Sequence, residues 1–206
     1  MRLMEELSMS TLSLNIQMHG KLVVIIGGGS VALRKLRTVL TTGAHVRVVA
    51  MEICPEINEL KDSGRVAIRG GSYMTTDLDK AFLVVAATDD TVVNEQVRSD
   101  AQKRGLMAAI ADNPSAGDYT FPAVLQRGDL NIAVSTGGRC PTFAVDVRDQ
   151  IAVHIGSEYS AILEQVAAER EKLLTNGSSS TYNASVLHSL AKRLIAEFTE
   201  RKEPLP

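Results

Sequence analysis

Five short runs of mainly apolar residues, separated by amphipathic or glycine-containing stretches, characterise the first half of the chain. The runs are Leu22–Ile26, His45–Ala50, Val66–Arg69, Phe82–Ala87 and Met107–Ala111. Most of them lack the alternation of a half-exposed strand, which indicates strands that are buried on both faces. Such strands are typical of an open parallel sheet with helices on both faces. The pattern therefore predicts an α/β fold.

Between these strands, apolar positions recur with helical spacing over residues 30–40 and 92–104. A glycine follows each segment, Gly43 after the first and Gly105 after the second. Glycine commonly ends a helix because it adopts the left-handed conformation without strain. We therefore expect two helices here, packed against the sheet.

The second half of the chain has a different character. Two strand-like runs over 120–126 and 130–135 flank Arg127-Gly128-Asp129, a turn sequence that predicts a hairpin. Helical segments are expected from about Thr142, over 158–174 and over 184–198, with a flexible linker at 175–181 and a charged tail at 200–206. We divide the chain into a first domain (1–113, with 1–13 as an extension), a central segment (114–150) and a helical domain (151–206).

A glycine-rich turn joins the first strand to the first helix. The pattern is G-x-G-x-x-A, with Gly27, Gly28 and Gly29 in the turn and Ser30 and Val31 opening the helix. Glycines allow a pyrophosphate to approach the backbone, and a helix N-terminus offers free N–H groups and the positive end of the helix dipole. The position between strand and helix favours nucleotide binding over the alternative, a strand-to-helix turn without a ligand.

Polar residues follow three other strands where each strand ends. Met51-Glu52, Thr88-Asp89 and Asp112-Asn113 lie at the carboxyl ends of parallel strands, where such sheets bind ligands. An acid near the end of the second strand holds the adenosine ribose in dinucleotide folds, so Glu52 has that role or is an N-terminal helix charge. The absence of Arg or Lys there favours NAD over NADP. Thr88 and Asp89 are expected to meet the cofactor or to cap the next helix.

Asp112 is the best candidate for chemistry. It directly follows a buried strand at the ligand-binding edge, where a carboxylate can accept a proton. The alternative is structural, because Asp-Asn-Pro is also a good turn sequence. A second glycine loop, residues 136–141, combines backbone N–H groups with the Thr136 hydroxyl and the Arg139 guanidinium. It could hold a substrate carboxylate or be a plain turn into the next helix.

Composition narrows the classes of partner. The 206 residues carry a formal net charge of −2, so we expect no nucleic-acid partner. No apolar run approaches the ~20 residues of a membrane span, and the N-terminus lacks the pattern of a signal peptide. Two cysteines and four scattered histidines predict no disulfide framework and no bound metal. The expected location is the cytoplasm, away from membranes.

Several motifs in this order and spacing resemble the precorrin-2 dehydrogenases, the N-terminal modules of siroheme synthases. The motifs are Gly27-Gly28-Gly29-Ser30-Val31-Ala32-Leu33-Arg34-Lys35, Ala87-Thr88-Asp89-Asp90 with Val93-Asn94, Asp112-Asn113-Pro114, Phe121-Pro122-Ala123 and Ser135-Thr136-Gly137-Gly138. The resemblance extends over roughly residues 14–206. It is to the stand-alone form, without a methyltransferase domain.

The resemblance implies a Rossmann-type NAD-binding domain, a central dimerisation segment and a small C-terminal helical domain, in a homodimer with exchanged segments. It also implies oxidation of the tetrapyrrole precorrin-2 to sirohydrochlorin, with NAD as hydride acceptor. Some members also insert Fe²⁺ into sirohydrochlorin, so Fe²⁺ would be a substrate rather than a resident metal.

Residue roles follow from the same resemblance. Asp112 matches the family's general base, and Thr136 matches a hydroxyl near the tetrapyrrole. Contacts to NAD are implied for Ser30-Val31 and Met51-Glu52. The remaining substrate contacts are expected from Asn113, beside the base, and from Arg127 and Arg139, which can hold some of the eight substrate carboxylates.

Two other functions remain open from the residues alone. A regulatory NAD-binding module would bind nucleotide without needing a base. A dehydrogenase of a small hydroxy or keto acid would usually show a catalytic Lys or His in a substrate domain, and no convincing candidate is present in this chain.

Overall fold

The computed structural model describes residues 11–61, 64–175 and 180–200 of the chain. The chain forms two compact units, residues 1–121 and residues 122–206. We call them the first and the second unit and describe each by itself.

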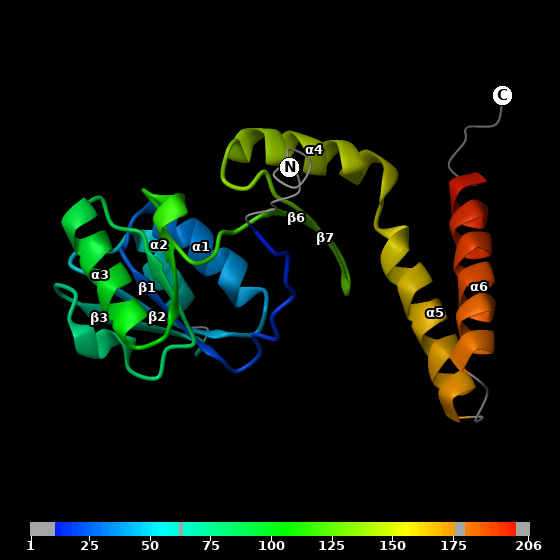
Figure 1. Ribbon diagram of the computed structural model, residues 1–206, viewed down its shortest axis with the longest axis horizontal. Coiled ribbons are helices and arrows are strands. Elements are labelled where there is room, and N and C mark those ends of the chain that lie inside the picture. The colour runs from blue at the N-terminus through cyan, green and yellow to red at the C-terminus, as the bar shows by residue number, and fades with distance from the viewer. Residues whose placement is uncertain (1–10, 62–63, 176–179, 201–206) are drawn as a thin grey trace, which may run out of the picture. The chain divides into compact units, whose positions relative to one another are not determined.

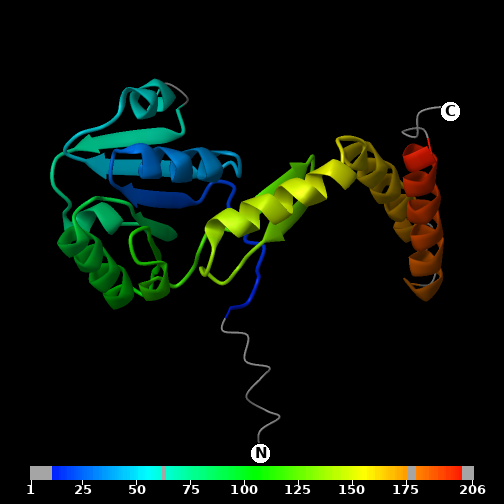
Figure 2. The same ribbon diagram turned by 90° about the horizontal axis from the view of Figure 1, so that it is seen from above.

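The first unit is built on a five-stranded parallel sheet in the order β3-β2-β1-β4-β5, whose strands run side by side in Figure 2. Its strands are β1 (Leu22–Ile26), β2 (His45–Ala50), β3 (Val66–Gly70), β4 (Leu83–Ala86) and β5 (Met107–Ile110). In the central register, Ile25 of β1 pairs with Val48 of β2 and Val85 of β4. The strand order and direction confirm the predicted α/β fold with an open parallel sheet.

Helices connect these strands, as the labels in Figure 1 show. They are α1 (Ser30–Leu40), α2 (Pro55–Lys61) and α3 (Thr91–Lys103), with short 3-10 helices η1 (Thr75–Leu78) and η2 (Pro114–Ala116). The two long helices lie where the periodicity predicts them, within a residue at each end. The sequence predicts no range for α2, a seven-residue helix that buries only Ile57, although one alternative for Glu52 assumes a helix start near it.

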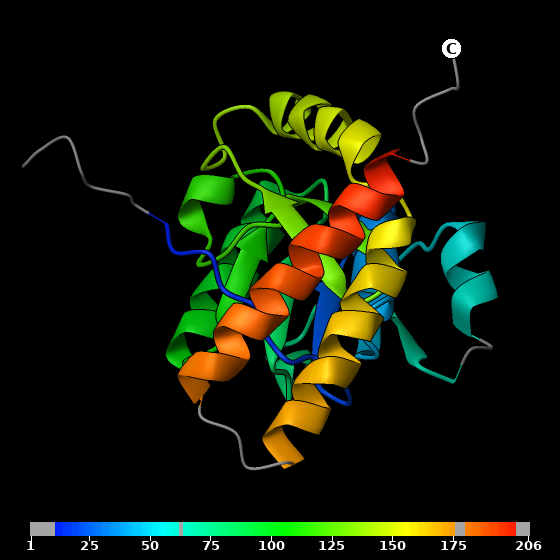
Figure 3. The same cartoon turned by 90° about the vertical axis from the view of Figure 1, so that its right-hand side faces the viewer.

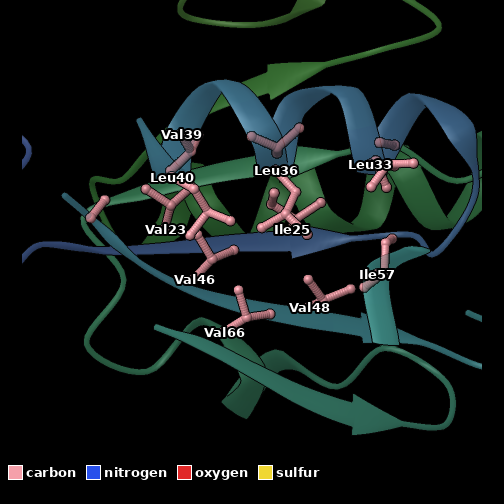
Figure 4. Packing of buried hydrophobic residues seen from close by; sticks show 14 of the residues in the cluster. Val23, Ile25, Leu33, Leu36, Val39, Leu40, Val46, Val48, Ile57 and Val66 are labelled. Atoms are coloured by element: carbon pink, nitrogen blue, oxygen red, sulfur yellow. The ribbon is translucent and has the colours of Figure 1, made fainter. Parts of the chain in front are cut away.

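Each face of the sheet packs its own apolar cluster. On one face, α1 inserts Leu33, Leu36 and Leu40 against the side chains of Val23 and Ile25 from the sheet (Figure 4). On the other face, Val97 and Ala101 of α3 pack against alternate residues of the same strands. Because both faces are covered, the central strands carry almost no polar residue, which explains their continuous apolar sequence.

The first unit continues past residue 113, the boundary that the sequence suggests. Asp118 bonds to β5 in both directions: its N–H donates to the Ala108 carbonyl at 2.8 Å, and its carboxylate accepts from the Ala108 N–H at 2.9 Å. Tyr119 and Phe121 then pack against the apolar cluster under α1, with ring centroids 5.6 Å apart. These contacts attach residues 114–121 to the sheet.

The second unit begins with an antiparallel hairpin of β6 (Ala123–Arg127) and β7 (Leu130–Val134). The hairpin was predicted, but β6 starts three residues later than the expected run, after Pro122. Helix α4 (Pro141–His154) lies along the hairpin, and α5 (Glu158–Thr175) packs beside α6 (Ser180–Glu200), as Figure 3 shows. No helix in the described ranges is long and apolar enough to cross a membrane.

We predict that Leu36→Ala lowers the free energy of unfolding by about 2–5 kcal/mol, because Leu36 is fully buried between α1 and the sheet. Urea unfolding followed by circular dichroism measures the change. The matched control is Val92→Ala on α3, where the side chain is 75% exposed; its effect should stay within about 0.5 kcal/mol. Equal effects of the two substitutions would contradict this packing.

Candidate functional site

A cleft of about 1030 Å³ runs along the carboxyl edge of the parallel sheet in the first unit. The cleft brings together all the residues that the sequence assigns to the cofactor, together with the candidate base. They are Gly27, Gly28, Gly29, Ser30, Val31, Met51, Glu52, Thr88, Asp89 and Asp112. These residues come from the ends of β1, β2, β4 and β5, which parallel pairing aligns at one edge.

The three glycines of the turn differ in what a side chain at each position would meet. A Cβ at Gly27 would collide with the carbonyl group of Ala87, and Gly27 has φ +127°, which disfavours any other residue. A Cβ at Gly28 would collide with the carbonyl oxygen of Glu52, and the Gly28 carbonyl accepts a hydrogen bond from Cys54 N at 2.9 Å. A Cβ at Gly29 meets no protein atom within 4 Å. Gly27 and Gly28 therefore pack the turn against its neighbours, and only Gly29 borders open space.

Helix α1 begins in the cleft without a cap. The N-cap residue is Gly29, no side chain bonds to the first N–H groups, and the first turn holds no acidic residue. Ser30 is the first helical residue and does not cap the helix. Uncapped N–H groups and the positive end of the dipole suit an anion such as a pyrophosphate.

At the end of β2, Glu52 is exposed and lines the cleft. Helix α2 starts three residues later, at Pro55, and its first turn already holds Glu56. The position of Glu52 therefore favours the ribose-binding alternative over a charge at the start of that helix.

Arg69, one residue before the end of β3, is engaged within the protein. Arg69 of β3 forms an ion pair with Asp77, which is 4% exposed, and donates from Nη2 to the Ser72 carbonyl at 2.7 Å and from Nη1 to the Gly70 carbonyl at 3.4 Å. Asp77 also accepts the N–H of Met74 at 2.8 Å. A guanidinium held in this way is not free to bind the 2′-phosphate that distinguishes NADP from NAD.

Tyr73 belongs to the same wall of the cleft. Its hydroxyl donates to Asp100 Oδ2 at 3.2 Å, and Thr75 Oγ1 donates to the same oxygen at 2.9 Å. Burial, followed by the nearby Asp100 carboxylate, raises the pKa of Tyr73, while the Thr75 hydrogen bond is the main cause that lowers the pKa of Asp100. The phenol therefore stays protonated and the carboxylate ionised at neutral pH.

The ends of β4 and β5 are joined by one buried amide. Asn94 of α3 accepts from Thr88 Oγ1 at 2.8 Å and from Thr88 N at 3.2 Å. Its Nδ2 donates to the Thr88 carbonyl at 3.0 Å and to Asp112 Oδ1 at 2.9 Å. The cap of α3 is Asp90, whose side chain accepts from Val92 N and Val93 N, and neither Thr88 nor Asp89 is the N-cap residue.

Sequence reasoning did not assign a role to Asn94, although a signal was present. Asn94, Val97 and Ala101 recur with helical spacing, so a polar residue interrupts the stripe that faces the sheet. Buried polar side chains are nearly always hydrogen-bonded, so such an interruption points to a specific partner. Only the fold identifies Asp112 as that partner.

The predicted substrate-binding residues fall outside this cleft. Asn113 follows Asp112 and accepts from Ser115 Oγ at 2.7 Å as the N-cap of η2. Three others belong to the second unit: Arg127 donates from Nε to the Ile155 carbonyl at 2.9 Å, and Thr136 accepts from Cys140 N at 3.1 Å. Arg139, with an exposed side chain, lies in the loop between Thr136 and α4. Their roles toward a substrate stay predictions.

Within residues 11–61, 64–175 and 180–200, no cluster of three or more His, Cys, Asp or Glu side chains could hold a metal ion.

A parallel sheet with a glycine turn, an uncapped helix and an acid beyond the second strand defines a dinucleotide-binding domain. The open space at Gly29 fits a pyrophosphate at this turn. The cleft thus combines the features of an NAD site with a carboxylate at its other end.

Comparison with known proteins gives the family. Residues 14–123, more than half of the chain, match a family described as "Putative NAD(P)-binding". Residues 127–154 match a family described as "Sirohaem biosynthesis protein central". The chain therefore belongs to this NAD(P)-binding family. The two matches together confirm the resemblance found from its motifs.

Siroheme synthases are among the similar proteins. The one from Photorhabdus laumondii subsp. laumondii is 32% identical over 165 residues, which are 80% of this chain and 35% of that protein. The one from Ectopseudomonas mendocina is 39% identical over 154 residues, which are 75% of this chain and 33% of that protein. The chain spans about a third of the length of the curated relatives it matches.

A solved structure shares the fold. SirC, precorrin-2 dehydrogenase, has a TM-score of 0.74 and 23% sequence identity, over 92% of this chain and 100% of that chain. The likeness covers both the sheet and the helical C-terminal region, and it supports the architecture of each unit.

We predict that Gly29→Asp weakens NAD binding about 100-fold, because the new carboxylate would cap the free N–H groups of α1 and repel the pyrophosphate. The fold should be retained, since Gly29 has φ −90° and open space around it. Calorimetric titration with NAD measures the affinity. Thr38→Asp places the same charge near the other end of α1 and should leave NAD binding unchanged; an unchanged affinity for Gly29→Asp would contradict the site.

Proposed function

We propose that the protein catalyses the NAD-dependent oxidation of precorrin-2 to sirohydrochlorin in siroheme biosynthesis. The observation that carries the proposal is that Asp112 shares one cleft with the glycine turn of a dinucleotide-binding domain. Membership of a sirohaem biosynthesis family and the similarity to SirC support the choice of substrate.

The reaction removes two hydrogens from the macrocycle, one as a hydride and one as a proton. NAD held at the glycine turn would supply the hydride acceptor. The proton requires a base with access to the cleft, and Asp112 has an exposed carboxylate there. One carboxyl oxygen accepts the hydrogen bond from Asn94, so the other is the oxygen that we assign to the proton. The proton then passes to water.

The cofactor in this proposal is NAD rather than NADP. Glu52 at the end of β2 suits the ribose hydroxyls, and a carboxylate there would repel a 2′-phosphate. The pairing of Arg69 with Asp77 removes that guanidinium from binding a 2′-phosphate. We assign contacts with the phosphates to Gly29, Ser30 and Val31, at the uncapped start of α1.

Substrate recognition is assigned to the polar residues that the family resemblance implicates. The eight carboxylates of the tetrapyrrole suit Arg127 and Arg139, and Thr136 and Asn113 offer hydrogen bonds. Insertion of Fe²⁺ into sirohydrochlorin is a further part of the proposal, because removal of two pyrrole protons would also suit a carboxylate at the macrocycle. Fe²⁺ would then be a substrate.

A homodimer with exchanged segments is part of the same proposal. The second unit has a hairpin of only two strands, and an isolated two-stranded sheet is marginal in water. Its helix α4 also exposes apolar side chains, with Phe143 at 59% and Val153 at 71%. We place the protein in the cytoplasm, which suits its free cysteines, Cys54 and Cys140.

We predict that the purified protein converts precorrin-2 and NAD to sirohydrochlorin and NADH, followed by absorbance. Asp112→Ala should reduce kcat by about 100-fold or more, since a general base contributes 10²–10⁴-fold. NAD binding by this variant should be unchanged. Adding Fe²⁺ to sirohydrochlorin in the presence of the protein tests the chelatase part separately.

The outcome also separates the alternative functions. A protein that binds NAD but never oxidises precorrin-2 would support a regulatory module, and turnover of a small hydroxy or keto acid would support the other dehydrogenase. Normal turnover by Asp112→Ala would show that the assignment of the base is wrong.

We predict that Phe143→Asp converts the dimer to a monomer, because a charge replaces an exposed apolar side chain on α4. Light scattering coupled to size exclusion measures the mass. Val92→Asp changes an apolar residue of the first unit that is 75% exposed and should leave the dimer intact. A wild-type protein that is monomeric at micromolar concentration would refute the proposed assembly.

A further inference from the structure

Asn94 is one of two buried polar side chains on α3, the other being Asp100. It is 1% exposed and stands on the face of α3 that packs against the sheet, next to Val97 in the helical stripe. It makes four hydrogen-bond contacts, three with Thr88 and one with Asp112. A primary amide has two donor hydrogens and an oxygen with two lone pairs, so this side chain is fully satisfied.

The partners determine which way the amide points. Thr88 N is a donor and requires the amide oxygen, whereas the Thr88 carbonyl and the Asp112 carboxylate are acceptors and require the NH₂ group. A flipped amide would place its oxygen against the carboxylate and its NH₂ against the Thr88 N–H. Only one orientation satisfies all of these groups, and it presents a donor to Asp112.

We propose that Asn94 is a positioning residue for Asp112. The Asn94 amide holds Oδ1 of the carboxylate, so that Oδ2 is the oxygen available to the substrate proton. The inference deepens the proposed function, because it rests on Asp112 being the base. Asn94 itself does not line the cleft. It therefore acts on the reaction through Asp112 and is not a catalytic residue.

The location of the two residues shows why a hydrogen bond that orients Asp112 is useful. Asp112 is exposed and lies beyond the end of β5, in the turn that leads to η2, where a carboxylate without a partner could rotate freely. Asn94 lies in the first turn of α3, a regular helix that is capped by Asp90. The amide thus transfers the rigidity of a helix to a side chain on a turn. Loss of orientation at a reacting group can cost about 100-fold in rate.

The same amide also bonds to the backbone of Thr88, so a simple loss of activity would not distinguish the two roles. A double-mutant cycle with Asp112 does distinguish them, since an effect that operates through Asp112 disappears when Asp112 is already removed. An effect through the Thr88 loop persists in that background.

The test compares wild type, Asn94→Ala, Asp112→Ala and the double variant in the precorrin-2 assay. We expect Asn94→Ala to lower kcat by about 10- to 100-fold, with the KM for precorrin-2 and the Kd for NAD within about threefold of wild type. The double variant should be no slower than Asp112→Ala. Losses that multiply, together with a weakened Kd for NAD, would overturn the inference and make Asn94 a support of the Thr88 loop.

A matched control accounts for stability. Thr75→Val removes a hydrogen bond to the buried Asp100 on the same helix, outside the wall that holds Asp112, and should leave kcat unchanged. If Asn94→Ala does not fold, Asn94→Ser provides the same comparison with a smaller loss of polar contacts. A kcat for the folded Asn94 variant equal to that of wild type would overturn the inference.

A second readout does not depend on turnover. In ¹⁵N-labelled protein, the side-chain amide resonance of Asn94 should shift on Asp112→Ala and stay in place in Thr75→Val. An unshifted resonance would show that the two side chains are not coupled and would overturn the inference. A wild type that shows this coupling but does not oxidise precorrin-2 would refute the proposed function and, with it, the kinetic role of Asn94.

Discussion

The close approach of three backbone segments at the glycine turn is the constraint on which the site depends. The carbonyl groups of Ala87 and Glu52 occupy the space that side chains at positions 27 and 28 would need. The turn can therefore lie directly against the ends of β2 and β4. Helix α1 consequently begins at the edge of the sheet, with its first N–H groups directed at the cleft instead of at a capping side chain.

The other end of the cleft depends on hydrogen bonding rather than on close backbone packing. There the buried amide of Asn94 connects the loop after β4 with the turn after β5. The ends of both strands are therefore hydrogen-bonded to the same buried side chain. A dinucleotide is long enough to require both kinds of order, because its phosphates need open backbone and its reacting ring needs a fixed neighbour. At the glycine turn, close backbone packing excludes side chains. Beside Asp112, a buried and hydrogen-bonded amide fixes the carboxylate.

The sequence predicts the structure correctly where the order of apolar and polar residues along the chain determines it. Buried parallel strands need apolar residues on both faces, and parallel ends share one edge, so the strands and the cleft residues could be predicted from Leu22–Ile26 onward. It failed where tertiary contacts decide. Helix α2 buries only Ile57 and has too few apolar positions for a periodic signal. The sequence assigns residues 114–121 to the central segment, yet Tyr119 and Phe121 pack on the core of the first unit. The partner of Asn94 could not be predicted, because 18 residues separate it from Asp112.

We propose that the glycine turn and Asp112 orient one nicotinamide ring between them. A crystal structure of the protein with NAD bound tests it most directly. We expect the pyrophosphate to lie on the N–H groups of Ser30 and Val31, and the nicotinamide to reach the end of the cleft beside Asp112. Density with the adenine beside Asp112, or with the phosphates away from the start of α1, would contradict it.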